Sequence, residues 1–201
     1  MDIRVLLILS ETWSHLYMRI VSLWLMLLVP AVAGATVLQP LQPLLDAAEE
    51  GATLVLAPGT YAGPVVVDKP MVIDGGNRAT IDAGGKGTVI LLDTDGATIK
   101  NLRITNSGES HNDIDAGVQI RGKFNVVKDN IIDNCLFGVD LQQSNNNVVR
   151  NNTISSKPFD LGQRGDSVRL WYSFDNKVTD NRISGVRDMV VWYSADNELS
   201  R

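Results

Sequence analysis

Short apolar runs with an apolar–polar alternation recur along the chain from about Gly51 to its last residue. Equivalent positions of four successive units hold Val127, Val149, Val178 and Leu199, at spacings of 22, 29 and 21 residues. The unit is therefore 21–22 residues long, with one insertion of about seven. Its period-2 stretches, such as Val139/Leu141, predict short strands, whereas a helical solenoid would show a 3.6-residue period.

One such unit cannot bury its own apolar face, but a stack of units encloses a continuous core of Val, Ile and Leu. The sequence therefore predicts an all-β fold, a single-stranded right-handed parallel β-helix (a solenoid). Asparagines recur at two corners of the coil, and stacked Asn side chains form amide ladders. The two sets are Asn125, Asn147, Asn176 and Asn197, and Asn130, Asn152 and Asn181.

The first coils are less regular. Residues 38–50 read as an amphipathic capping helix with Leu41, Leu44, Leu45 and Ala48 on one side, which covers the open N-terminal edge of the stack. Strands are predicted at residues 52–56, 65–67, 71–73, 80–81, 89–91 and 98–99, with Gly-containing pairs at the corners.

Both ends of the chain carry signals of their own. Residues 1–35 read as a secretory signal peptide, because an apolar run after Arg19 precedes Ala33-Gly34-Ala35. Met18 is the better start, and an uncleaved anchor helix is the alternative. Residues 36–201 form the β-helix domain. Because Leu199 begins a strand that nothing completes, we expect a C-terminal truncation of a longer protein, or else an oligomer partner over this end.

Net charge and cysteine content restrict the classes of function that the chain can have. The net charge of −5 argues against nucleic-acid binding, which requires a basic face. Cys135 is the only cysteine, so it has no disulfide partner in this chain and is expected to be a small buried apolar residue.

Several motifs carry a family resemblance. The stretch Ala57-Pro58-Gly59-Thr60-Tyr61 is similar to the opening of many carbohydrate-binding or sugar-hydrolase β-helices. The segments around residues 107–117, 136–144, 164–173 and 186–194 together resemble the NosD proteins, including Arg164-Gly165-Asp166-Ser167 and Trp192-Tyr193-Ser194. NosD proteins are periplasmic β-helix proteins that help mature nitrous oxide reductase.

The resemblance implies a periplasmic, non-enzymatic accessory protein that assists assembly of the reductase's copper–sulfur centres. It implies an ABC transporter and a copper chaperone as partners, association with the membrane only through them, and copper as a possible cofactor that the residues themselves do not reveal. The alternative is a carbohydrate-binding or carbohydrate-active β-helix. A lyase or hydrolase is a minor possibility, because no polygalacturonase-type Asn-Thr-Asp motif is present.

Two insertions interrupt the repeat, at Thr105–Asp115 and Ser155–Asp166. Both follow the same type of strand, so we expect them to project from one edge, two coils apart, where solenoids usually place function. Their candidate ligand- or partner-binding residues are Glu109, Asp113, Asp115 and Asp166, and His111 is the candidate metal ligand. The alternative is a pair of solvated polar loops.

The last candidates are aromatic. Trp171 and Trp192 lie 21 residues apart and should stack on adjacent coils, with Tyr172 and Tyr193 beside them. If the tyrosines pack inward, the tryptophans form an outward ladder able to dock a protein partner or a sugar ring. The alternative is that the rings cover a seam beneath a loop. Arg169 and Asp140 share a coil position and are expected to form an ion pair of little energetic value.

Overall fold

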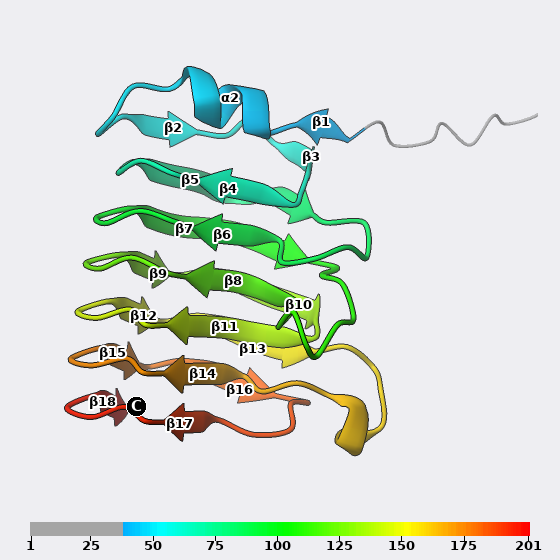
Figure 1. Ribbon diagram of the computed structural model, residues 1–201. Coiled ribbons are helices and arrows are strands. Elements are labelled where there is room, and N and C mark those ends of the chain that lie inside the picture. Colours follow the sequence, from blue (N-terminus) through cyan, green and yellow to red (C-terminus); the bar gives the residue numbers. More distant parts are fainter. Residues whose placement is uncertain (1–37) are drawn as a thin grey trace, which may run out of the picture. The chain divides into compact units, whose positions relative to one another are not determined.

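Parallel strands stack along a single axis, one coil per rung, in a computed structural model that describes residues 38–201 (Figure 1). Each regular coil contributes one strand to a six-stranded sheet and two strands to a twelve-stranded sheet. The predicted right-handed parallel β-helix is confirmed. The proposed signal peptide, residues 1–35, lies outside the described residues.

The strands of each sheet follow one another along the stack. The twelve-stranded sheet comprises β1 (Gln39–Pro40), β2 (Thr53–Val55), β3 (Gly59–Ala62), β5 (Val72–Asp82), β7 (Thr98–Thr105), β9 (Val126–Lys128), β10 (Ile131–Cys135), β12 (Val148–Arg150), β13 (Thr153–Ser156), β15 (Lys177–Thr179), β16 (Arg182–Ser184) and β18 (Glu198–Ser200). The six-stranded sheet comprises β4 (Val65–Val67), β6 (Ile90–Leu92), β8 (Ala116–Ile120), β11 (Phe137–Gln142), β14 (Val168–Trp171) and β17 (Val190–Trp192).

The core is the enclosed interior of the coils. Val127 pairs with Val149, and Val149 with Val178, on consecutive rungs, and the first two of these side chains are fully buried. Their outward neighbours, such as Val126 and Lys128, are only partly buried. Because the side-chain period of a strand is 2, this register follows directly from the repeat spacing.

The predicted asparagine ladders are present. Asn147 accepts a hydrogen bond from the Asn125 backbone N–H (2.8 Å) and donates one to the Asn176 side chain (3.0 Å). A second ladder joins the Asn130, Asn152 and Asn181 side chains at 3.0 Å per step. These amides satisfy backbone groups at corners that the sheets leave unpaired, which explains the recurrence of Asn without any ligand.

Corners are also marked by left-handed backbone. Asp129, Asn151 and Asp180 occupy one corner with φ of 57°, 54° and 56°. Asn and Asp tolerate this conformation better than other side chains, which explains why they recur there.

The N-terminal cap is shorter than predicted. Helix α2 spans only Gln42–Ala47 and is preceded by β1, so the expected helix over residues 38–50 is wrong in extent. Leu41 and Leu45 are buried as expected, but Leu44 is 45% exposed. The Gln42 side chain both donates to and accepts from the backbone of Val66, at 3.0 and 2.8 Å. The helix therefore occupies hydrogen-bonding groups of the edge strand β4, as a cap should.

Two other predictions need correction. The strands predicted at 71–73 and 80–81 are not separate: both fall in β5, which begins at Val72 and carries an irregularity between Asp74 and Ala79. The strand predicted at 98–99 continues to Thr105 as β7. Within residues 38–201, no helix has the length and apolar character needed to span a membrane.

Candidate functional site

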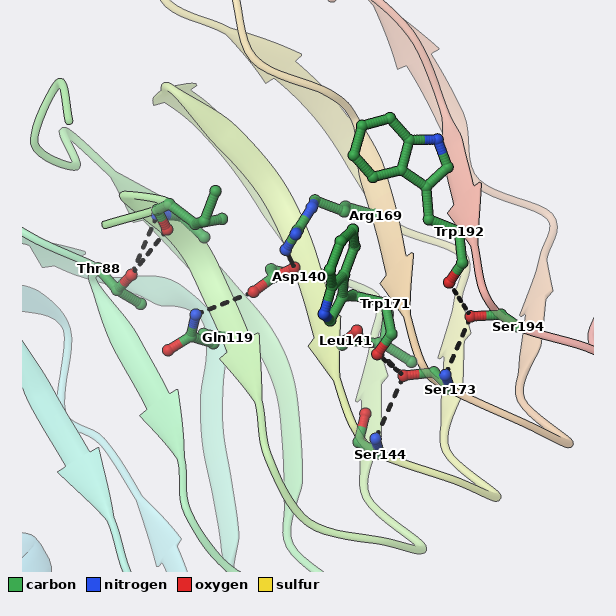
Figure 2. A network of polar contacts seen from close by, with 12 residues as sticks. Thr88, Gln119, Asp140, Leu141, Ser144, Arg169, Trp171, Ser173, Trp192 and Ser194 are labelled. Atoms are coloured by element: carbon green, nitrogen blue, oxygen red, sulfur yellow. Dashed lines mark hydrogen bonds and ion pairs between the residues drawn. The ribbon is translucent and has the colours of Figure 1, made fainter. Parts of the chain in front are cut away.

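The predicted tryptophan stack lies on the outer face of the six-stranded sheet. Trp171 of β14 pairs in register with Trp192 of β17, and their ring centroids are 5.4 Å apart. Leu170, between Trp171 and the outward Arg169, is fully buried, so the tryptophans point outward. Trp192 is 56% exposed and Trp171 is half-buried. Figure 2 shows both indoles on the same side of the sheet.

The tyrosines do not pack inward as the conditional prediction required. Tyr172 and Tyr193 stack on each other with centroids 4.8 Å apart and ring planes within 10°, and both are exposed. Their φ values of 48° and 49° are left-handed, which ends the strand alternation directly after each tryptophan. The four rings contact one another and form one outward-facing group, the aromatic ladder (Trp171, Tyr172, Trp192 and Tyr193).

An ionic network underlies one side of this ladder. Arg169 Nη1 donates to Asp140 Oδ1 at 2.8 Å, and Gln119 Nε2 donates to Asp140 Oδ2 at 2.9 Å (Figure 2). The Asp140 side chain is fully buried and that of Arg169 is 13% exposed. Burial raises the pKa of Asp140, while the hydrogen bonds and the Arg169 charge lower it. The predicted cross-rung pair is therefore present, but the neighbouring rungs remove its carboxylate from water, so the small value of an exposed pair no longer applies to it.

The network and the ladder are in contact. The Arg169 guanidinium lies 4.9 Å from the centroid of the Trp171 ring, within cation–π distance. This contact and the fixed carboxylate hold Trp171 in place. Beside Trp171 lies a hollow of about 280 Å³, which is lined by Trp171, Val191, Trp192 and Tyr193. Such a rigid aromatic surface can stack a flat ring or receive an apolar side chain of a partner.

The two insertions meet at one edge of the stack. They follow β7 and β13, which both pair with β10, so they are two coils apart, as predicted. His111 Nε2 lies 3.0 Å from the carbonyl oxygen of Gln163 in the second insertion, and the His111 ring is edge-on to Phe137. The insertions border a hollow of about 470 Å³ lined by residues that include Glu109, His111 and Phe159.

Of the four acidic candidates, only Glu109 lines this hollow. Asp115 Oδ2 accepts from the Ser110 backbone N–H (2.8 Å), and Asp113 Oδ2 accepts from the Ser110 hydroxyl (2.7 Å), so both organise the first loop. Asp166 is buried and pairs with Arg187 at 2.9 Å. Glu109 is exposed and pairs with Lys157 Nζ at 3.5 Å. Each of the four carboxylates therefore has a protein partner.

The donor set does not fit a copper site. No group of three His, Cys, Asp or Glu side chains able to hold a metal occurs within residues 38–201. Cys135 is buried, as predicted, and burial raises the pKa of its thiol to about 12, which disfavours the thiolate that copper prefers.

Sequence reasoning missed two residues of these surfaces. Gln119 completes the Asp140 network, and its position 21 residues before Asp140 is a repeat signal that could have revealed it. Lys157 belongs to the second insertion, is buried, and pairs with Glu109 of the first, and no sequence pattern marks it.

Comparison with known proteins agrees with this architecture. The family model described as "Right handed beta helix region" matches residues 75–200. The chain is similar to the "Probable ABC transporter binding protein NosD" of Pseudomonas aeruginosa, with 31% identity over 136 residues. That match covers 66% of this chain but 32% of the relative, so the chain spans about a third of the length of the curated relative it matches. No solved structure matches the chain.

Proposed function

The chain belongs to the right-handed β-helix family, and from this premise we propose that it is a NosD-type accessory protein that assists assembly of the copper–sulfur centres of nitrous oxide reductase. The similarity to a NosD protein is the observation that carries the proposal. The proposed place of action is the periplasm, reached through the signal peptide. The proposed partners are an ABC transporter and a copper chaperone, through which the protein is associated with the membrane.

The aromatic ladder is the proposed docking surface for a protein partner. Trp and Tyr are enriched at protein interfaces because one ring combines a large apolar area with a polar atom. Arg169 and Asp140 hold Trp171 from behind, so the surface is ordered before any partner arrives. Preorganisation lowers the entropic cost of association.

The proposed role is not enzymatic. Glycosidases need two carboxyl groups that face each other across the substrate. Asp113 and Asp115 instead hydrogen-bond to the same residue, Ser110, and Asp166 is paired with Arg187. Their engagement in structural contacts supports an assembly role over hydrolysis.

Copper enters the proposal as cargo of the assembly system. Because the described donors do not fit a resident copper site, we assign none of them to a metal-dependent step. Copper titration of the full chain and of His111→Ala tests the remaining hypothesis for this residue. Equal stoichiometry in the two proteins would remove His111 as a ligand.

Deletion of the encoding gene in a cell that makes nitrous oxide reductase tests the function. The reductase should still be exported but should contain less copper, by mass spectrometry of the purified enzyme, and should consume nitrous oxide slowly. Complementation with Trp171→Ala/Trp192→Ala should restore less activity than the wild type, whereas Phe124→Ala, which removes a 61% exposed aromatic ring outside the ladder, should restore it fully. A fully metallated reductase in the deletion strain would refute the proposal.

A second candidate function is carbohydrate binding, because an aromatic hollow of about 280 Å³ beside the Arg169 guanidinium also suits a sugar ring. Retention of the wild-type chain on immobilised polysaccharide, lost in Trp171→Ala and kept in Phe124→Ala, would favour this function. Equal retention of all three proteins would exclude the aromatic ladder as a sugar site.

A further inference from the structure

Three basic side chains follow one another on consecutive rungs of the twelve-stranded sheet, away from the aromatic ladder. Lys100 of β7 pairs in register with Lys128 of β9, and Lys128 with Arg150 of β12. The residues before them, Ile99, Val127 and Val149, are fully buried, so the three basic residues point outward. We call them the basic ladder; β9 and β12 lie one above the other in Figure 1.

This arrangement is electrostatically unfavourable on its own. Adjacent rungs are about 4.8 Å apart, and like charges directly opposite each other destabilise a sheet. Lys100 is compensated by Asp74 at 3.1 Å. For Lys128 and Arg150, no carboxylate within residues 38–201 lies at ion-pair distance. Within residues 38–201, these two neighbouring positive charges therefore have no ion-pair partner, in a chain whose net charge is −5.

An apolar column runs beside the charges. Val126 and Val148 pair in register, point outward and are only partly buried. With Arg150, Lys177, Thr179 and Glu198 they line a shallow hollow of about 350 Å³. The face thus presents a basic column and an apolar column side by side on rigid strands.

We propose that this face docks an extended acidic segment of a partner protein, whose carboxylates meet Lys128 and Arg150 and whose apolar side chains cover Val126 and Val148. Charge complementarity selects the acidic partner. The unpaired basic column holds only two residues, Lys128 and Arg150, and suits a narrow peptide better than the broad charged surface of an anionic bilayer. No aromatic ring lines the hollow to stack a sugar, so a peptide fits it better than a polysaccharide.

Fluorescence anisotropy of the full chain with a labelled peptide of about ten alternating Glu and Val residues tests the proposal. The peptide should bind, its Gln–Val counterpart should bind far more weakly, and added salt should weaken binding because exposed charges are screened. Lys128→Gln/Arg150→Gln should reduce affinity by about twofold to fivefold for each charge removed. Arg78→Gln/Lys86→Gln changes two exposed residues outside the ladder, alters the net charge equally, and should bind like the wild type.

Thermal unfolding separates binding from a structural role. Because the ladder charges repel each other, Lys128→Gln/Arg150→Gln should melt at the wild-type temperature or above it, and the single variants likewise. A lower melting temperature in the single variants would overturn the proposal, as would equal losses in the control pair. Tighter binding to polygalacturonate or to phosphatidylserine-containing vesicles than to the Glu–Val peptide would also overturn it. The proposal does not depend on the role in reductase assembly. It concerns the twelve-stranded sheet, not the aromatic ladder, and it is tested by peptide binding, not by the copper content of the reductase.

Discussion

Replacing Arg169 with methionine tests how much the buried network around Asp140 contributes to the free energy of unfolding. Asp140 has one carboxylate oxygen bound by Arg169 at 2.8 Å and the other by Gln119 at 2.9 Å, and its side chain is fully buried. Methionine retains much of the apolar stem of arginine but cannot donate a hydrogen bond. The variant therefore leaves a buried carboxylate oxygen without its cationic partner.

The expected loss of stability is large. Removing one partner of a buried ion pair typically costs about 3–5 kcal/mol, because the remaining charge stays buried. Arg103→Met is the matched control: Arg103 also pairs across rungs, with Asp133 at 3.0 Å, but its side chain is 54% exposed. An exposed pair contributes only about 0–1 kcal/mol. The two variants should thus differ several-fold in their effect on the free energy of unfolding.

The pH dependence of the stability loss gives a second test, for which the direction of the change is predicted. Burial raises the pKa of Asp140 above 3.8. A carboxyl whose pKa is higher in the folded state stabilises the fold below the unfolded pKa, and this contribution is lost as the pH rises through the folded pKa. Loss of Arg169 removes a charge that opposes the rise. The penalty of Arg169→Met relative to the wild type should therefore grow between about pH 4 and pH 7.

Urea-induced unfolding followed by circular dichroism, at several pH values in that window, measures both effects. Asp140→Asn in the Arg169→Met background should recover part of the loss at pH 7, because it removes the stranded charge. Equal destabilisation by Arg169→Met and Arg103→Met, or a penalty independent of pH, would refute the argument that burial of Asp140 dominates.

Three further predictions concern the rest of the stack. Asn147→Ala should lower the free energy of unfolding by about 1–3 kcal/mol in urea titrations, because a buried backbone N–H and a carbonyl lose their partner; a change below about 0.5 kcal/mol would contradict this role. Gly122→Ala should lower the melting temperature by about 5–10 °C, since its Cβ would lie 1.8 Å from the Thr94 oxygen, whereas Gly162→Ala, with open space around it, should melt like the wild type. Cys135, buried and with its pKa raised to about 12, should resist alkylation at pH 8 in the native protein and react in denaturant; rapid native labelling would show that the site is accessible.

Local repetition made much of the fold predictable. Val127 and Val149, 22 residues apart, pair in the sheet because one coil advances the chain by one rung. Offsets of 21 and 29 residues likewise placed Trp171 beside Trp192 and Asn147 beside Asn176. Where the repeat is weak the predictions were less accurate, as at α2, where Pro43 lies in the first turn and only six residues are helical.

Candidate site residues were harder to predict, since their roles depend on side chains far away in the sequence. Asp113 and Asp115 looked like ligands, but both hydrogen-bond to Ser110 within the same loop. His111 and Gln163 are in contact although they lie 52 residues apart in the sequence, and no pattern in either insertion predicts this contact.

By itself, the sequence determined the β-helix, the rung-to-rung register and the aligned tryptophans, because a strict repeat in the chain becomes a strict repeat in space. Only the tertiary structure decided which outward residues are buried, because burial depends on the neighbouring rungs. Asp140 points away from the core yet is fully enclosed between Gln119 and Arg169, whereas Tyr193 reaches solvent through a left-handed corner. The physical reason is that alternation sets the direction of a side chain, while adjacent coils set its contact with water.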